Sequence, residues 1–307
     1  MADVYSDFAR VYDELMDNAP YGDWCEHIDA LIQEYGISRP IRCESGRCPD
    51  GAAVDIQGAD ETHLESSIHE AEAELQSQMP DSEALLASER NLVLDMGCGT
   101  GTLTELLSHK GYDMIGVDNS PQMLEIAMEK RSESGSGILY LLQDMRELEL
   151  YSTVGTVISV CDSLNYLLEE KDLLQVFRLV DNYLYPGGLF LFDFNTVYKY
   201  GQVIGDAVIA ENREDCSFIW ENYYHEEEEV NEYDLTVFVQ EEGDRFRRFT
   251  ENHFQRGYRA ETMCGLVEQA GMQVIRLLDA DTLGEVTDQS ERVYVLAREC
   301  RKRQEVI

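Results

Sequence analysis

Three closely spaced glycines that follow a short apolar run are the first feature of this 307-residue chain that could take part in chemistry. Residues 91–95 have the composition of a buried strand, and Gly97, Gly99 and Gly101 follow them ahead of a helix-like segment, 103–109. Glycines in such a turn let backbone N–H groups approach a ligand at a helix N-terminus. The order of strand, glycine turn and helix therefore predicts a ligand site.

The polar residues around this turn indicate which ligand it would suit. A dinucleotide fingerprint needs a third glycine three residues after the second, where this chain has Thr102. Asp95 would repel a pyrophosphate but suits a ligand with an ammonium group. Asp118 ends a second predicted strand, where a carboxylate can accept both hydroxyls of an adenosine ribose, although a turn residue is an alternative interpretation. Together these residues favour an adenosine compound without phosphates, which S-adenosylmethionine satisfies.

The elements around the turn alternate between strand and helix patterns. Apolar runs predict strands at 91–95, 112–118, 138–143, 156–161, 188–194, 272–278 and 292–297, and helical periodicity predicts helices at 103–109, 120–130, 171–184 and 260–270. Alternating segments at 217–224, 232–239 and 245–254 interrupt this rhythm. We therefore expect a Rossmann-like, doubly wound α/β fold with a mostly parallel seven-stranded sheet, helices on both faces, and an antiparallel β excursion.

The same patterns divide the chain into five segments. We expect an N-terminal helical cap (1–37), a polar surface insertion whose composition is also typical of disorder (38–88), a cofactor-binding α/β core (89–195), an antiparallel β substrate subdomain (196–256), and a C-terminal helix and strands that complete the sheet (257–307). Within the insertion, residues 61–78 have some helical character.

Charge and composition exclude several classes of protein. The 24 basic and 61 acidic residues give a net charge of −37, which argues against a nucleic-acid partner. No apolar stretch is long enough to span a membrane, and the first residues lack a signal-peptide layout, so we expect a cytoplasmic protein. Cys43 and Cys48 could be half of a metal site, but His63 and His69 lack the usual spacing, so we expect no metal. No pattern indicates an oligomeric state.

Four motifs, taken in order, resemble those of class I S-adenosylmethionine-dependent methyltransferases. They are Asp95-x-Gly97-Cys98-Gly99-Thr100-Gly101, Val117-Asp118-x-Ser120-x-x-Met123-Leu124, Gln143-Asp144-Met145 and Leu184-x-Pro186-Gly187-Gly188. The resemblance is strongest over residues 89–195. Within the family, the opening around Tyr12, the segment 161–166 and the β excursion resemble a bacterial small-molecule branch, from which the insertion at 38–88 departs.

The resemblance implies a binding site for S-adenosylmethionine. Its residues would be Tyr12, Asp95, Gly97, Cys98, Gly99, Gly101, Asp118, Asn119, Met123, Asp144, Met145 and Cys161. Asp95 and the backbone near Cys161 would hold the ammonium group, and Asp118 the ribose. Asn119, Asp144 and Met145 would surround the adenine. Tyr12 would close over the cofactor, or would equally well be a core aromatic residue of an amphipathic helix.

The implied reaction is in-line transfer of a methyl group to a small-molecule acceptor, which needs alignment more than side-chain chemistry. Candidates for a base are Asp162, Asn165 and Asn195, which follow the fourth and fifth predicted strands but would also suit helix caps. Candidates for acceptor binding are Tyr166, Asn195, Trp220, His253 and Arg256, although Arg256 could instead pair with nearby acids. The alternatives are methylation of a protein or RNA, a cofactor-binding regulatory module, and, least favoured, a nicotinamide dehydrogenase.

Overall fold

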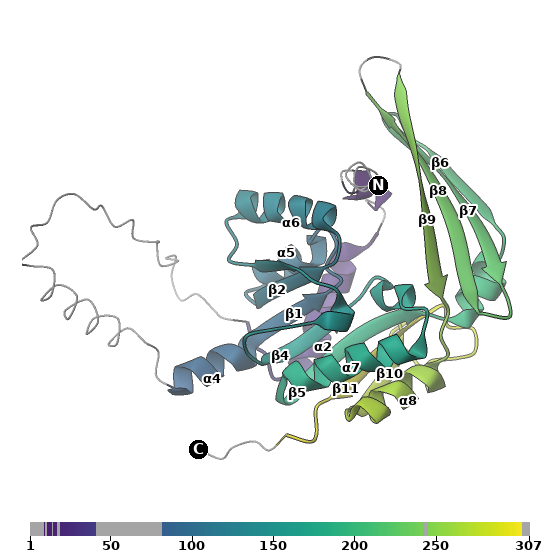
Figure 1. Cartoon of the computed structure of the whole chain (residues 1–307). Coiled ribbons are helices and arrows are strands. Elements are labelled where there is room, and N and C mark those ends of the chain that lie inside the picture. Colours follow the sequence, from purple (N-terminus) through teal and green to yellow (C-terminus); the bar gives the residue numbers. More distant parts are fainter. Residues whose placement is uncertain are drawn as a thin grey trace, which may run out of the picture.

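Two β-sheets form the framework of the computed structural model, which describes residues 9, 11–13, 15–16, 19–40, 82–241, 243 and 245–302 (Figure 1). Within these residues, seven strands form one sheet in the order β10-β11-β5-β4-β1-β2-β3. All are parallel except β11, which runs antiparallel to both of its neighbours. The strands are β1 (Leu92–Met96), β2 (Asp113–Asp118), β3 (Leu139–Leu142), β4 (Val154–Ser159), β5 (Leu184–Asn195), β10 (Gln273–Asp279) and β11 (Arg292–Arg298). The expected fold class is confirmed.

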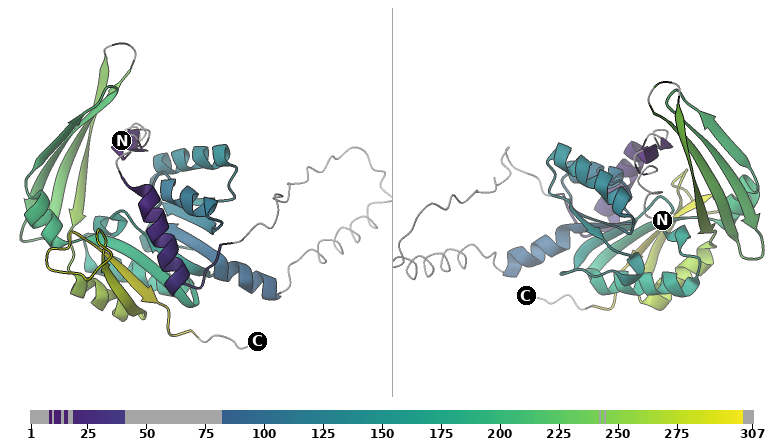
Figure 2. Two further views of the ribbon diagram at one scale, coloured as in Figure 1. Left: turned by 180° about the vertical axis from the view of Figure 1, so that it is seen from behind. Right: turned by 45° about the horizontal axis from the view of Figure 1, so that its top comes forward.

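Helices cover both faces of this sheet, as Figures 1 and 2 show from opposite sides. One apolar cluster joins α2 (Tyr21–Tyr35), α5 (Thr102–His109) and α6 (Pro121–Ser134) to one face. A second cluster joins α7 (Glu170–Tyr183) and α8 (Ala260–Ala270) to the other. Helix α6 begins where the sequence predicts, because the Ser120 hydroxyl accepts from the Met123 N–H and Pro121 occupies the first helical position.

Strand β5 shows how one segment serves both faces. Phe190, Phe192 and Phe194 belong to the cluster under α7 and α8, whereas Leu189 and Leu191 belong to the cluster under α2. This alternation follows from the two-residue period of a strand. The next position on the α2 face is Asp193, which is only 1% exposed and lies at the carboxyl end of the strand. The two-residue period therefore places a buried acid at the carboxyl ends of the strands, where the candidate site lies.

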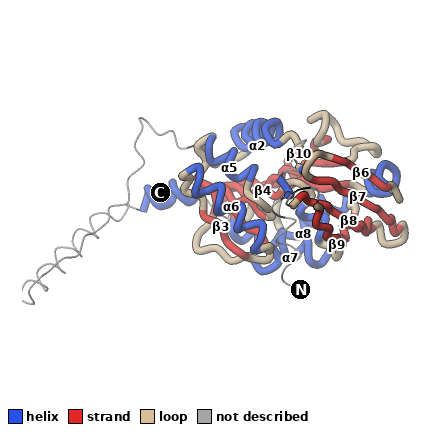
Figure 3. The backbone as a smooth tube through the Cα atoms, turned by 90° about the horizontal axis from the view of Figure 1, so that it is seen from above, coloured by secondary structure: helices blue, strands red, loops and turns tan. Residues whose placement is uncertain are grey.

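The second sheet is antiparallel, in the order β6-β7-β8-β9, and rises beside the first in Figure 1. Its strands are β6 (Val208–Asn212), β7 (Cys216–His225), β8 (Val230–Gln240) and β9 (Phe246–Arg256). Three of them coincide with the predicted alternating segments. Strand β6 and the π-helical turn η4 (Lys199–Ile204) were not expected from periodicity. Seen from above in Figure 3, the two sheets lie next to each other.

Several sequence expectations fall outside the described residues. They are the helix at 61–78, the Cys43 and Cys48 pair, and most of the insertion, of which the structure describes residues 38–40 and the helix α4 (Ser82–Asn91). Among the described residues, no helix is long and apolar enough to cross a membrane, and no group of His, Cys, Asp and Glu side chains is arranged to hold a metal ion. The five-segment division of the chain stays a prediction.

Close packing where α4 meets β4 gives a stability prediction. A Cβ atom added to Gly155 would collide with the Arg90 carbonyl oxygen and approach the buried Ser38 hydroxyl to 2.5 Å. We expect Gly155→Ala to lower the free energy of unfolding by about 3 kcal/mol, measured by denaturant titration. Gly265→Ala, in α8 with no atom near the new methyl group, should instead raise it by about 1 kcal/mol. Equal effects of the two changes would contradict the packing.

Candidate active site

A large cleft of about 640 Å³ lies where the carboxyl ends of the parallel strands face the antiparallel sheet. One wall comes from residues that follow β1, β2, β3 and β4, and the other from β7, β8 and β9. The carboxyl ends of the strands are where open α/β sheets bind ligands. The cleft therefore joins the two parts of the protein that the sequence associates with cofactor and acceptor.

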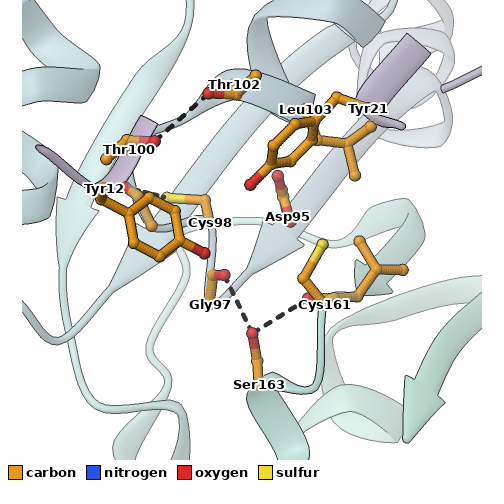
Figure 4. Close-up of a pocket in the computed structure, with 12 residues that line it drawn as sticks. Tyr12, Tyr21, Asp95, Gly97, Cys98, Thr100, Thr102, Leu103, Cys161 and Ser163 are labelled. Atoms are coloured by element: carbon orange, nitrogen blue, oxygen red, sulfur yellow. Dashed lines mark hydrogen bonds between the residues drawn. The ribbon is translucent and has the colours of Figure 1, made fainter. Parts of the chain in front are cut away.

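A small cavity of about 60 Å³ opens beside the cleft, under Tyr12 and Tyr21 (Figure 4). The cavity and the cleft share several lining residues, among them Gly97, Gly99 and Cys161, whereas Asp95 lines the cavity only. Burial raises the pKa of both tyrosines, so they stay neutral in this position. The N-terminal segment thus forms a wall of the candidate cofactor site.

The glycine turn needs its glycines for backbone conformation. Gly97, Gly99 and Gly101 all have positive φ angles, of 79°, 55° and 73°. A Cβ atom at Gly99 would meet nothing within 4 Å, so open space lies in front of this backbone. Gly101 lines neither cavity, because it begins α5 and packs against Tyr140. Gly97 and Gly99 are therefore the two glycines placed to approach a ligand.

Asp95 is a buried acid at the small cavity. Asp95 is only 2% exposed, and its Oδ2 accepts a 2.6 Å hydrogen bond from the Thr104 hydroxyl. Burial raises its pKa to about 7, and the nearby Asp118 carboxylate adds to the increase. A cation in the cavity would reverse this effect, because it would favour the charged carboxylate.

Asp118 holds the glycine turn against β2. Its Oδ2 accepts from the Gly99 N–H and its Oδ1 from the Ser120 N–H, both at 2.8 Å. Burial nevertheless raises its pKa, which these hydrogen bonds counteract. Each carboxylate oxygen keeps a further lone pair. Asp118 is therefore a turn residue, and it also lines the cleft, where a ribose could reach it.

Asn119, Met123, Asp144 and Met145 line the same part of the cleft. Both oxygens of Asp144 bind the Arg146 guanidinium, at 2.5 to 3.1 Å, and this pairing lowers the Asp144 pKa. Cys98 and Cys161 line the small cavity, where burial raises the pKa of both thiols. Gly101 is thus the one predicted cofactor residue that lines neither space within the described structure.

The three candidates for a base are placed differently. Asp162 and Asn195 line the cleft, and Asn165 does not. The Asn165 side-chain amide is hydrogen-bonded to backbone groups. Its Nδ2 donates to the carbonyls of Asn195 and Arg256, and its Oδ1 accepts from the Asn195 N–H at 2.9 Å. Asn165 is fully buried and joins β5 to β9 rather than facing a substrate.

Four of the five acceptor candidates line the cleft, namely Tyr166, Asn195, Trp220 and His253. Arg256 does not. Its guanidinium donates to the Leu168 carbonyl at 3.0 Å, pairs with Glu170 at 3.6 Å, and lies over the Tyr258 ring. Arg256 therefore pairs with an acid, which was the alternative to acceptor binding. The acid is Glu170 of α7 and not a residue on a neighbouring strand.

Sequence reasoning missed a polar group that lines the cleft and consists of Lys199, Tyr200, Gln255 and Arg292, of which Arg292 pairs with the buried Asp193. The Lys199 ammonium and the Arg292 guanidinium both bind the Asn195 side-chain oxygen, at 3.0 and 3.4 Å. Burial lowers the pKa of Lys199, and Arg292 lowers it further. The run Phe192-Asp193-Phe194 was a usable signal, because an acid inside a buried strand needs a partner.

Asp193 fixes the turn after β4. Cys161 and Asp162 both have positive φ angles, 62° and 56°, which are costly for residues with a side chain. Their N–H groups donate to the two Asp193 oxygens at 3.1 and 2.9 Å. Arg292 lies 3.7 Å from Asp193 and stacks on Trp24 of α2. Burial still raises the Asp193 pKa despite this guanidinium.

Comparison with known proteins finds related methyltransferases. Residues 93–188 match a family model described as a methyltransferase domain. The Bacillus subtilis (strain 168) protein named "Putative methyltransferase YqeM" is 30% identical over 299 residues, which cover 97% of this chain and 98% of the relative. A solved S-adenosylmethionine-dependent methyltransferase from Clostridium acetobutylicum ATCC 824 is 26% identical, with a TM-score of 0.64, over 77% of this chain and 99% of its own.

The turn held by Asp193 gives a second prediction. Asp193→Ala leaves two strained N–H groups without their acceptor and removes one of the two acids that pair with the buried Arg292 guanidinium, so it should lower the free energy of unfolding by about 3 kcal/mol. The control is Asp113→Ala. Asp113 is the first residue of β2, at the end of that strand away from the cleft, and burial alone raises the pKa of its carboxyl group. Its removal should leave stability unchanged or higher. Denaturant titration of both variants makes the test, and an unaffected Asp193→Ala protein would contradict the assignment.

Proposed function

Since this chain belongs to the class I S-adenosylmethionine-dependent methyltransferases, we propose that it transfers the methyl group to a small-molecule acceptor by in-line displacement. The observation that carries the proposal is a cleft in which candidate cofactor residues and the aromatic and polar residues of the antiparallel sheet lie opposite one another. Its volume falls within the range of about 300–1,000 Å³ usual for small-ligand sites.

The residues present fit S-adenosylmethionine. When bound, the cofactor supplies a methyl group already activated on a sulfonium. The open space before Gly99 leaves room for its amino-acid end, and the neighbouring Asp95 carboxylate would pair with its ammonium group. Asp118 would accept the ribose hydroxyls through its remaining lone pairs. Asn119 and Met145 would contact the adenine from the same wall.

Charge complementarity supports this placement. Asp95 and Asp118 interact unfavourably with each other and are both desolvated. A ligand with an ammonium and a sulfonium group would relieve that repulsion, whereas a diphosphate would increase it. The acids therefore favour a cationic nucleoside over a dinucleotide.

The opposite wall suits a compact organic acceptor. Phe218, Trp220 and Leu235 present apolar surface from β7 and β8, and Tyr166 and His253 add polar atoms. Apolar surface of this kind would help to keep water away from a bound acceptor and to align the nucleophile with the methyl–sulfur bond, which is most of what the reaction needs. The net charge of −37 gives RNA no long-range attraction, so the small molecule is preferred.

Methyl transfer from isotope-labelled S-adenosylmethionine tests the proposal. Calorimetry should show cofactor binding by the wild-type protein, and Asp118→Ala should weaken it by about 1–3 kcal/mol through lost hydroxyl contacts. Label should enter the small-molecule fraction of a cell extract and persist after macromolecules are removed. Label found only in protein or RNA would replace the small-molecule acceptor with a macromolecular one. Binding without any transfer would favour a regulatory module.

The pH dependence of cofactor binding should report on Asp95. Its pKa of about 7 means that affinity for S-adenosylmethionine should rise about tenfold per pH unit below 7 and level off above it, as calorimetry at several pH values would show. Asp95→Asn should bind weakly at every pH. A wild-type affinity that does not change with pH would place the ammonium group elsewhere.

The same carboxyl should affect the unliganded protein in the opposite sense. Because its folded-state pKa lies above that of an unfolded aspartate, its contribution to stability is present at acidic pH and is lost as the pH rises through about 7. Asp95→Asn removes that loss. The variant should therefore melt at a higher temperature than the wild type in alkaline buffer, even though it binds the cofactor less well.

A further inference from the structure

We propose that a relay of Tyr166, His253 and Glu251 receives the proton that the acceptor's hydroxyl or amine group loses when it is methylated, which makes Tyr166 a catalytic residue. The inference rests on the proposed function and names the class of acceptor: a nucleophile that carries a proton to lose. Tyr166 is on η3 (Ser163–Tyr166), directly after the turn that Asp193 fixes, and it lines the cleft with His253.

The three side chains form a continuous path away from the cleft. The Tyr166 hydroxyl lies 3.4 Å from His253 Nδ1, and His253 Nε2 lies 3.0 Å from Glu251 Oε2. Glu251 and His253 share one face of β9 because they are two residues apart on a strand. The path therefore runs from a partly exposed phenol, 46% accessible, to a buried carboxylate, 5% accessible.

The carboxylate fixes the direction of the relay. An ionised Glu251 can only accept, so His253 donates from Nε2 and leaves the Nδ1 lone pair to accept from Tyr166. Tyr233 lies 3.0 Å from the Tyr166 hydroxyl, and burial raises its pKa well above normal, so it remains a donor to the Tyr166 oxygen. Tyr233 also stacks on the His253 ring, with centroids 4.8 Å apart. The imidazole is thus held in one plane.

The surroundings favour a proton on His253 during the reaction. Glu251 Oε1 is buried and has no hydrogen-bond partner in the part of the chain that the structure describes. A carboxylate desolvated in this way is better compensated by an imidazolium than by a neutral imidazole. The titratable groups that act on Tyr233, beside the relay, are Tyr166 itself, Tyr200 and Asp162. The cations that line the same cleft, Lys199 and Arg292, bind the Asn195 side-chain oxygen.

A second observation indicates a polar ligand at this wall. Trp220 lines the cleft, and its ring lies edge-on to Tyr233 at 5.5 Å. Its indole N–H is buried and has no acceptor among the described residues. A buried donor without a partner is costly, and an acceptor atom on the bound molecule would satisfy it. Trp220 would then orient the nucleophile beside Tyr166.

The other polar groups of the cleft are less suited to take a proton. Asp162 accepts a 2.6 Å hydrogen bond from the Gln255 amide and lies 3.7 Å from the Arg292 guanidinium. Both contacts stabilise its ionised form. Asn195 is an amide, and its oxygen binds Lys199 and Arg292. The relay of Tyr166, His253 and Glu251 leads away from these groups to the antiparallel sheet.

The step balances without another reactant. The lone pair of the acceptor oxygen or nitrogen forms the bond to the methyl carbon, and the carbon–sulfur pair stays on sulfur, which becomes a neutral thioether. The acceptor's proton passes to the Tyr166 oxygen as the Tyr166 proton passes to His253 Nδ1. The imidazolium, paired with Glu251, returns the proton through Tyr166 to solvent after the product leaves.

Nitrogen NMR of isotope-labelled histidine tests the relay without an acceptor. His253 should carry its proton on Nε2 and should change its Nδ1 signal in Tyr166→Phe. Glu251→Gln should change the Nε2 signal of His253. His225, which pairs with Glu232 at 2.9 Å on the same sheet but does not line the cleft, is the internal control and should not respond to either variant. A proton on Nδ1, or no response to Tyr166→Phe, would overturn the relay.

Methyl transfer into the small-molecule fraction of a cell extract supplies the catalytic measurement. Tyr166→Phe should slow transfer about 100-fold or more, with calorimetric affinity for S-adenosylmethionine unchanged. Glu251→Gln should move the pH–rate profile. Tyr223→Phe, on an exposed face of β7 outside the cleft, should match the wild type. Full activity in Tyr166→Phe would also overturn the relay.

The two proposals fail in different ways. If the wild-type protein binds the cofactor but labels only macromolecules, the small-molecule acceptor is wrong, and the NMR result still decides whether His253 is poised as described. If the wild type labels small molecules and the Tyr166→Phe rate is unchanged, the proposed function stands and the relay is wrong.

Discussion

The site depends on one buried carboxylate that holds a strained turn. Two successive residues after β4, Cys161 and Asp162, adopt left-handed backbone conformations that side chains disfavour. Asp193 accepts both of their N–H groups, and Arg292 faces it from β11. Because β5 lies between β4 and β11 in the sheet, the interaction joins three neighbouring strands at one edge. The turn leads directly into η3, so the placement of Tyr166 follows from this contact.

The part of the site proposed for the cofactor and the part proposed for the acceptor differ in their charges. At the first, Asp95 and Asp118 are desolvated acids whose pKa values are raised. A positively charged group beside them would stabilise their ionised forms. At the second, the cations Lys199 and Arg292 already share Asn195 and are balanced by Asp162 and Asp193. Under the proposed function the first part would favour a cationic ligand, whereas the two cations of the second part already have acids beside them.

The antiparallel sheet closes the cleft by a simple pattern. Alternate residues of β7, β8 and β9 face the core, so short-range sequence spacing places Trp220, Tyr233 and His253 on one surface. Their opposite neighbours face solvent and carry much of the acidic charge, such as Glu221, Glu232 and Asp234. The same strand period therefore builds an aromatic wall and a solvated outer surface from one continuous segment.

The sequence by itself determined the α/β fold class, the strands of the seven-stranded sheet with most of the helices between them, and the placement of Gly97, Gly99 and Asp118 around one turn. These features depend on local periodicity and on spacing within one strand–turn–helix unit. The sequence could not show that Asn165 is hydrogen-bonded to backbone groups whereas Asp162 lines the cleft, because both residues follow the same strand.

Only the tertiary structure decided which distant side chains meet. It brought Asp193 to Cys161, His253 to Tyr166, and Arg256 away from the cleft to Glu170. These contacts join elements about 30 to 90 residues apart in the chain. Their geometry is set by sheet register and by the packing of the antiparallel sheet against η3 and η4, which no local pattern encodes.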